Sequence, residues 1–226
     1  ALAPVPRGLS TVQAAAIWQQ YLTAYGPLVE YAELGPGVTV LVTAATASVG
    51  HACIQVAKAL GATVIATTRS ASKAEGLRRT GADHVVVTSE QPLAERVQAW
   101  TAGRGADVIV DSISGPVVDE LAACAAYRGK IFLYGRLDER PTPFPLIACM
   151  KRALSITGYT LWEIVLEPER RARAERWIVE RLEQGVFAPV IDRVFTLDQI
   201  REAHACMDAN LANGKLVVAV TSEAAA

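Results

Sequence analysis

Short apolar runs rich in β-branched residues alternate with longer segments of helical periodicity from about residue 38 onward. Six of these runs predict strands, because each is apolar at consecutive positions and too short for a buried helix. The segments between them predict helices. The predicted strands are residues 38–43, 63–67, 84–87, 106–111, 130–134 and 154–157, and the predicted helices lie near residues 49–60, 71–80, 91–102, 116–126 and 143–152.

Strands that are apolar on both faces and separated by helices indicate a parallel sheet covered on two sides. The sequence therefore predicts an α/β protein with a doubly wound, six-stranded parallel sheet of the Rossmann type. The two ends of the chain do not fit this sheet. Residues 11–34 predict a helical stretch that leads into the first strand, and residues 186–221 predict a strand, a helix and a last strand. A surface helix is predicted after Pro168.

Composition narrows the class of partner. The 226 residues carry a formal net charge of -1 with acidic and basic side chains interspersed, so the sequence predicts no nucleic-acid or membrane partner. A small-molecule substrate is expected instead. The chain has no apolar run of transmembrane length and no secretory signal pattern at its start, which predicts a cytoplasmic protein. The four cysteines lack ligand spacing and predict buried, reduced thiols and no metal.

The segment between the first strand and the first helix has the position of a dinucleotide-binding loop. Glycines there allow a tight turn, a close approach of the pyrophosphate, and close packing of helix on strand. The three positions hold Ala44, Ala47 and Gly50, so only the packing glycine remains. Alanine costs least where φ is negative, and Ser48 adds a hydroxyl that can cap the helix or donate to a phosphate. The pattern alone leaves a phosphate site and a structural turn open.

The end of the second strand indicates the type of coenzyme. Proteins that prefer NAD place an acid there to hold the ribose hydroxyls, whereas this chain has Thr68 followed by Arg69, Ser70 and Lys73. A guanidinium, a hydroxyl and an ammonium suit a ribose 2′-phosphate, which favours NADPH over NADH. The alternative is that Ser70 caps the next helix while Arg69 and Lys73 are solvated.

Several segments together resemble the medium-chain dehydrogenase/reductases, and within them the zinc-independent, quinone-oxidoreductase-like branch. The similarity covers essentially the whole chain in the family's order. The matching residues are 14–16, 22–25, 36–42 leading into AATASVG, QVAKALGATVIATTRSASKAE at 55–75, 81–85 and GKLVV at 214–218.

The resemblance implies a domain organisation and an activity. Residues 1–35 would connect from a barrel-like catalytic domain, residues 36–185 would form the dinucleotide-binding domain, and residues 186–226 would return to the catalytic domain. Most of that domain would be missing, either because the chain is a fragment or for another reason. The implied activity is NADPH-dependent hydride transfer to a quinone, enone or related carbonyl compound, and the alternative is an inactive nucleotide-binding or oligomerisation module. A homodimer through the edge strand is also implied.

The resemblance also assigns site residues, position by position. Thr23 would lie beside the nicotinamide ring, and Gln19 stands where metal-dependent members carry a zinc-ligating cysteine, so catalytic zinc is not expected. The remaining residues are Ala47, Ser48 and Val49 at the pyrophosphate, Arg69, Ser70 and Lys73 at the 2′-phosphate, Ser112 and Ile113 near the adenosine, Gly135 and Arg136 by the nicotinamide amide, and Asn210 and Lys215 reaching back to the coenzyme.

Catalytic side chains are not identified by the sequence. Tyr21, Tyr134 and Tyr159 are conceivable proton donors, although each fits a packing role better. His51 begins the first helix, where a cation opposes the helix dipole, and is expected to be partly exposed or, alternatively, neutral beside the coenzyme. Trp162 is expected to pack or to line the acceptor pocket or a subunit contact.

Overall fold

A six-stranded sheet forms the main body of the computed structural model, which describes residues 5–220. The strand order is β3-β2-β1-β4-β5-β6 and every neighbouring pair is parallel. This is the order of a doubly wound dinucleotide-binding sheet, so the predicted fold class is confirmed. The strands are β1 (Thr39–Val42), β2 (Thr63–Thr68), β3 (His84–Val87), β4 (Ala106–Asp111), β5 (Ala125–Leu133) and β6 (Ser155–Gly158).

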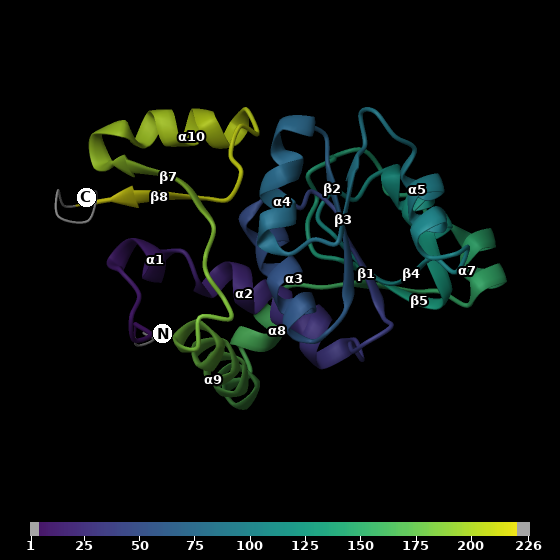
Figure 1. Cartoon of the computed structure of the whole chain (residues 1–226), viewed down its shortest axis with the longest axis horizontal. Coiled ribbons are helices and arrows are strands. Elements are labelled where there is room, and N and C mark those ends of the chain that lie inside the picture. Colours follow the sequence, from purple (N-terminus) through teal and green to yellow (C-terminus); the bar gives the residue numbers. More distant parts are fainter. Residues whose placement is uncertain (1–4, 221–226) are drawn as a thin grey trace.

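Helices cover both faces of the sheet, as Figure 1 shows. One face packs against α3 (Ser48–Ala59) and α4 (Ala74–Thr80), and α2 (Trp18–Tyr25) and α9 (Pro168–Glu183) add buried side chains to the same core. The other packs against α5 (Leu93–Trp100), α6 (Val117–Cys124) and α7 (Leu146–Arg152). Consecutive strand residues therefore enter different cores, which explains why the strands are apolar at successive positions.

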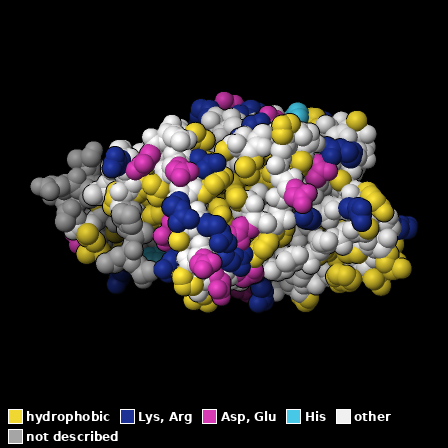
Figure 2. Space-filling model, turned by 90° about the horizontal axis from the view of Figure 1, so that it is seen from below, with side chains coloured by type: hydrophobic (Ala, Val, Ile, Leu, Met, Phe, Trp, Pro, Cys, Tyr) yellow, Lys and Arg dark blue, Asp and Glu magenta, His cyan; other side chains and the backbone are white. Residues whose placement is uncertain are grey.

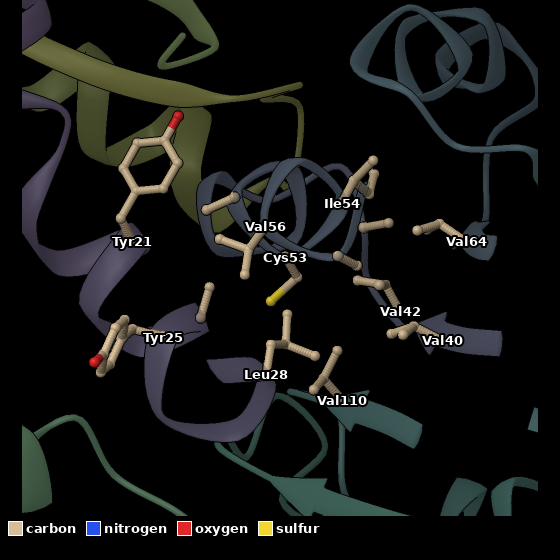
Figure 3. Close-up of a cluster of buried hydrophobic side chains, with 14 of the residues drawn as sticks. Tyr21, Tyr25, Leu28, Val40, Val42, Cys53, Ile54, Val56, Val64 and Val110 are labelled. Atoms are coloured by element: carbon tan, nitrogen blue, oxygen red, sulfur yellow. The ribbon is translucent and has the colours of Figure 1, made fainter. Parts of the chain in front are cut away.

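The core beneath α3 fixes that helix on the sheet. Cys53 and Val56 of α3 belong to one cluster of buried side chains with Val40, Val42 and Val110 of the strands, and side chains of α2 lie beside them (Figure 3). All five side chains are at most 1% exposed. The four cysteines of the chain are free thiols; three are buried and Cys149 is half-buried.

The N-terminal helical stretch is interrupted rather than continuous. It consists of α1 (Thr11–Ala15), α2 and a π-helix η1 (Gly26–Tyr31). The break at η1 coincides with Pro27, which has no backbone N–H to donate to the preceding turn. The Tyr159 hydroxyl donates to the carbonyl oxygen of Leu22 at 3.2 Å and stabilises the end of α2 from outside the helix.

The fifth strand begins earlier than the sequence predicts. Ala125 and Ala126, expected at the end of a helix, are the first residues of β5, and Ala125 pairs with Ala106 before the register shifts. Both residues are buried, and alanine fits a buried helix end and a buried strand start equally well. The periodicity therefore did not separate the two.

The C-terminal part builds a second, small sheet. After α8 (Trp162–Val165) and α9, the chain forms β7 (Ile191–Thr196), the 3-10 turn η3 (Leu197–Gln199), α10 (Ile200–Asp208) and β8 (Lys215–Ala219). The two strands pair in parallel and α10 packs on them, at the left of Figure 1. These elements match the predicted strand, helix and strand. The domain boundaries at 35/36 and 185/186 stay a prediction.

No helix among residues 5–220 has both the length and the apolar character needed to cross a bilayer.

The start of α3 lies unusually close to the loop that follows β1. A Cβ atom added to Gly50 would lie 2.5 Å from the Cα atom and the carbonyl oxygen of Ala45. A glycine is therefore required at this position by the close packing of α3 on that loop, and the sequence places the packing glycine here.

Replacement of Gly50 by alanine is expected to destabilise the fold by about 1 to 3 kcal/mol, because the added methyl must displace backbone atoms. Urea denaturation measures the change. Gly35→Ala is the matched control, since a Cβ there meets nothing within 4 Å. Equal unfolding midpoints for the two variants would contradict the packing role.

Candidate active site

The carboxyl ends of the central strands surround a crevice at the point where the strand order reverses. β1 and β4 are neighbours there, and their following loops diverge to opposite faces of the sheet. Open α/β sheets bind ligands in this crevice. The predicted site residues of the loops after β1, β2, β4 and β5 are therefore brought to one edge.

The loop after β1 presents the start of α3 to this crevice. Ala47 is the N-cap with extended backbone, its N–H donates to the Ala44 carbonyl at 3.0 Å, and its carbonyl accepts the N–H of His51 at 3.1 Å. The first-turn amides that follow Ala47 have no intrahelical acceptor, which creates an anion-binding position. The expectation of negative φ holds at Ala47 but is wrong at Ala44, where φ is +42°.

The two basic side chains of the turn after β2, Arg69 and Lys73, have different surroundings. The Arg69 side chain is exposed and forms no hydrogen bond or ion pair with residues 5–220. Lys73 Nζ instead donates to the carbonyls of Asn210 and Ala212 at 2.9 and 2.8 Å, and burial lowers the pKa of Lys73. Lys73 is therefore not simply solvated.

Ser70 does not act as a helix cap. Its hydroxyl lies 2.8 Å from the Ser72 hydroxyl, and no side-chain cap bond is formed at the start of the following 3-10 turn, η2 (Ala71–Lys73). The Ser70 N–H donates to Thr68 Oγ1 at 3.1 Å. The alternative that the Ser70 side chain caps the next helix is therefore wrong. The Ser70 hydroxyl lies in the same turn as Arg69.

Residues 210–215, which we call the strap, cross from α10 to β8 along the same edge. Gly214 forms an isolated parallel bridge with Ala47. Lys215 Nζ donates to Gln19 Oε1 at 3.1 Å, and burial lowers the pKa of Lys215. The strap thereby places Gly214 at the loop before α3, Asn210 at Lys73 and Lys215 at Gln19.

A cavity of about 320 Å³ lies at the other end of the crevice. Thr23 is buried in its wall and donates its hydroxyl to the Gln19 carbonyl at 2.7 Å. Trp162 is 59% exposed and also lines the cavity, so the expectation of simple packing is wrong, and its place in an acceptor pocket or a subunit contact stays a prediction. The other lining residues are Gln19, Val49, Ser112, Tyr134, Gly135, Leu137, Thr160 and Leu161.

A buried carboxylate holds the loop after β4 beside this cavity. Asp111 is fully buried and accepts hydrogen bonds from the Thr43 hydroxyl at 2.5 Å and from the Ser114 N–H at 2.7 Å. Two predicted site residues lie outside the cavity wall. Ile113 offers its carbonyl to Asp138, and the exposed Arg136 donates to the carbonyl of Glu139 in its own loop.

Two hydroxyls in the cavity wall have no hydrogen-bond partner of normal geometry in the part of the chain that the structure describes. Ser112 Oγ and the Tyr134 hydroxyl are buried side by side, and neither forms a hydrogen bond of normal geometry with another atom of residues 5–220. An unpaired buried hydroxyl costs stability, so a pair of them at a cavity indicates a position for a polar ligand. Burial raises the pKa of Tyr134, and likewise of Tyr21 and Tyr159, which makes all three poor acids.

Comparison with known proteins identifies the family. The model of the zinc-binding dehydrogenases matches residues 48–180, more than half of the chain. The chain belongs to this family. The zinc-binding dehydrogenases that it resembles in structure are medium-chain dehydrogenase/reductases, so the resemblance drawn from the sequence is confirmed.

Two curated relatives are longer than this chain, and the match covers only part of each. A 2-haloacrylate reductase of a Burkholderia species is 29% identical over 217 residues, which are 95% of this chain and 65% of the relative. One component of the phenolphthiocerol/phthiocerol polyketide synthase of Mycobacterium tuberculosis is 28% identical over 218 residues, which are 96% of this chain and 10% of the relative. The chain thus spans less than two thirds of either.

Two solved structures have the same fold. Escherichia coli quinone oxidoreductase complexed with NADPH superimposes with a TM-score of 0.88 at 27% identity and covers 96% of this chain and 67% of that protein. An NAD-dependent alcohol dehydrogenase superimposes with a TM-score of 0.87 at 32% identity and covers 97% and 62%. The fold of this chain is therefore shared by one oxidoreductase described with NADPH and one described as NAD-dependent.

The donor atoms at the family's metal position do not suit zinc. Gln19 stands where the zinc-ligating cysteine would be, and its amide oxygen already accepts a hydrogen bond from the Lys215 ammonium. The Lys215 ammonium would repel a zinc ion at this position, and a neutral amide is a weak ligand for zinc. The part of the chain from residue 5 to 220 contains no group of three or more His, Cys, Asp or Glu side chains that could hold a metal ion.

The sequence missed the surroundings of His51. The side chain is 1% exposed, so the expectation of partial exposure is wrong. Its ring bonds Thr80 and Asn213, and neither residue was expected near the site. A histidine at a helix start was the only signal, and it does not reveal a partner 162 residues away.

The Tyr134→Phe variant tests two separate effects of the Tyr134 hydroxyl, its effect on stability and its effect on coenzyme affinity. Without coenzyme, its unfolding temperature is expected to equal or exceed that of the unaltered protein, because a buried unbonded hydroxyl is removed. Affinity for a nicotinamide coenzyme is expected to fall about three- to tenfold, the value of one hydrogen bond. Thermal unfolding and calorimetric titration measure the two effects. A loss of stability with unchanged affinity would contradict the ligand-facing role.

Proposed function

We propose that this chain is an NADPH-dependent oxidoreductase, or the coenzyme-binding portion of one, that transfers a hydride to a quinone, enone or related carbonyl compound. The observation that carries the proposal is the exposed Arg69 guanidinium after β2, which has no hydrogen-bond or ion-pair partner among residues 5–220 and follows Thr68 in place of an acid. A fixed positive charge without an intramolecular partner suits a ribose 2′-phosphate.

The other predicted contacts support the same ligand. The amides of Ser48 and Val49 would receive the pyrophosphate at the start of α3, and Ser70 would add a hydroxyl near Arg69. Two of the three N–H donors of Lys73 already bond to the strap. Lys73 can therefore offer one N–H donor and its positive charge to the 2′-phosphate. We therefore assign the larger part of 2′-phosphate recognition to Arg69.

The cavity at the other end of the crevice would receive the nicotinamide ring and the acceptor. When bound, the coenzyme supplies the hydride. Thr23, Val49 and Trp162 form walls that limit the ring's orientation and exclude water, and Ser112 and Tyr134 offer the unpaired hydroxyls. Lys215 donates to Gln19, which lines the cavity, and its ammonium would contribute a positive charge near that wall.

The proton that follows the hydride comes from outside this set of side chains. Burial raises the pKa of each candidate tyrosine, and Tyr21 and Tyr159 already donate to Gln55 Oε1 and to the Leu22 carbonyl. We infer that solvent or a residue beyond this chain protonates the product. The names of the relatives, a 2-haloacrylate reductase and a quinone oxidoreductase, support a conjugated acceptor.

Consumption of NADPH in the presence of a quinone or of 2-chloroacrylate tests the activity. We expect binding of NADPH by calorimetry together with a fall in NADPH absorbance that depends on the acceptor. Binding without turnover would favour the alternative, a nucleotide-binding or oligomerisation module. Absence of binding would reject both proposals.

Arg69→Glu tests the coenzyme assignment. The variant is expected to weaken NADPH binding about tenfold to a hundredfold and to leave NADH binding unchanged, because only the 2′-phosphate meets the altered charge. Arg201→Glu on α10 makes the same charge change at an exposed site with no hydrogen bond or ion pair to residues 5–220. A similar loss in both variants would show a general charge effect, and an unchanged NADPH affinity in Arg69→Glu would defeat the assignment.

We propose that the chain forms a homodimer through the β6 edge of the sheet. β6 has no neighbouring strand on one side and three of its four residues are exposed. Next to it, the region of α7 exposes the large apolar side chains of Phe144, Leu146, Ile147 and Met150, each at least 53% exposed. Figure 2 shows hydrophobic side chains grouped at the right-hand end of the molecule, where Figure 1 places α7. An unpaired edge beside an apolar patch favours pairing with a second copy.

The double substitution Ile147→Glu and Met150→Glu is expected to convert the dimer to a monomer by placing charges in the apolar contact. Light scattering measures the molecular mass. Leu166→Glu, at a residue 72% exposed and outside the patch, should leave the mass unchanged. A monomeric unaltered protein at all concentrations would remove the proposal.

A further inference from the structure

The strap, residues 210–215, is anchored to three separate parts of the dinucleotide-binding sheet and its helices. Lys73 holds the carbonyls of Asn210 and Ala212, Gly214 bridges Ala47, and Lys215 bonds Gln19. Between these anchors lies Asn213, whose side chain turns inward to His51 on the first turn of α3. Every anchor lies beside a residue assigned above to coenzyme binding.

His51 lies between α4 and the strap. Its Nδ1 is 2.8 Å from Thr80 Oγ1, and its Nε2 is 3.2 Å from Asn213 Oδ1. A neutral ring protonated at Nε2 satisfies both contacts, with Nε2–H donating to Asn213 and the Thr80 hydroxyl donating to Nδ1. The partners assign this tautomer. Thr80 is also 3.0 Å from the Gly76 carbonyl and can give its proton to only one of the two.

Two features favour the neutral form of His51. Burial lowers the pKa of His51, and a positive charge on the first turn of α3 would oppose the helix dipole. The ring therefore contributes hydrogen bonds to this contact and not charge. A rigid side chain with a nitrogen at each end can join two elements in this way.

Gly76 supplies an independent observation that the contact is specific. A Cβ atom at this position in α4 would lie 2.7 Å from the Asn213 amide nitrogen. Glycine inside a helix is unfavourable, so α4 gives up helix stability where the Asn213 side chain enters. His51, Thr80 and Gly76 together form a receptor for one side chain of the strap.

We propose that His51 is a positioning residue for the coenzyme site: oriented by Thr80, it holds Asn213 and thereby fixes the strap against the start of α3. The bridge from Gly214 to Ala47 carries this constraint to the loop that ends in Ser48 and Val49. A cavity of about 510 Å³ adjoins His51 on the side of β7 and leaves space for the strap to shift when the contact is lost. The part of the inference that concerns the coenzyme rests on the proposed function; the fixing of the strap does not.

Hydrogen exchange of the chain without coenzyme tests the fixing of the strap. In His51→Leu, peptides covering residues 210–215 are expected to exchange about three- to tenfold faster, the equivalent of one or two lost hydrogen bonds. Asn213→Ala should give the same change, and the double variant should be no faster than either single one. His51→Gln, which keeps a donor near the position of Nε2, should restore most of the protection. Gly76→Ala should speed exchange in the strap although it favours the α4 helix.

Coenzyme titration and kinetics test the positioning role. In His51→Leu we expect the Kd and KM for NADPH to rise about three- to tenfold, while kcat at saturating NADPH stays unchanged and His51→Gln recovers affinity. His204→Leu, an exposed histidine on α10, is the matched control and should change neither exchange nor affinity.

The outcomes distinguish the two proposals. Unchanged exchange of residues 210–215 in both His51→Leu and Asn213→Ala, or additive effects in the double variant, would overturn the role of His51. If the unaltered protein binds no NADPH, the proposed function fails while the exchange experiment still decides the fixing of the strap. If His51→Leu does not fold, exchange of residues 210–215 is measured in Asn213→Ala and Gly76→Ala instead. These variants disturb the same contact at the strap and at α4.

Discussion

The contact of Gly50 with Ala45 is the constraint on which the site depends. It sets the first turn of α3 directly against the loop after β1, so that the unbonded amides of that turn reach the carboxyl edge of the sheet. Ala47, in the short loop before the helix, bridges Gly214 of the strap. One missing methyl group therefore places the predicted anion site, His51 and the strap within one structural unit.

The fold was largely predictable because its signals are local. A parallel sheet buried on both faces produces short apolar runs, and the helices between them follow from spacing alone. The grouping of predicted site residues also follows from this topology, since all carboxyl ends of parallel strands share one edge. The early start of β5 and the break at Pro27 were missed, because Ala125 and Ala126 fit two structures and a helical pattern does not reveal where its backbone bonds change.

The functional details were less predictable because they depend on partners far along the chain. Arg69 and Lys73 are equivalent in the sequence, yet the structure leaves one guanidinium free of partners among residues 5–220 and binds the other cation to backbone carbonyls of the strap. Every residue has a backbone carbonyl, so the amino-acid sequence does not indicate which carbonyls a lysine will bind. His51 illustrates the same limit, since its burial depends on Asn213 and on the absence of a side chain at Gly76.

The left-handed backbone of Ala44 has a consequence for the energetics of recognition. An alanine in this conformation costs about 1 kcal/mol relative to glycine, and the folded protein bears that cost whether or not a ligand is present. A glycine-rich loop would sample many shapes and lose that freedom on association. The loop of this chain has already lost it during folding, so its preorganised shape can convert contacts with an anion into affinity with a smaller entropic penalty.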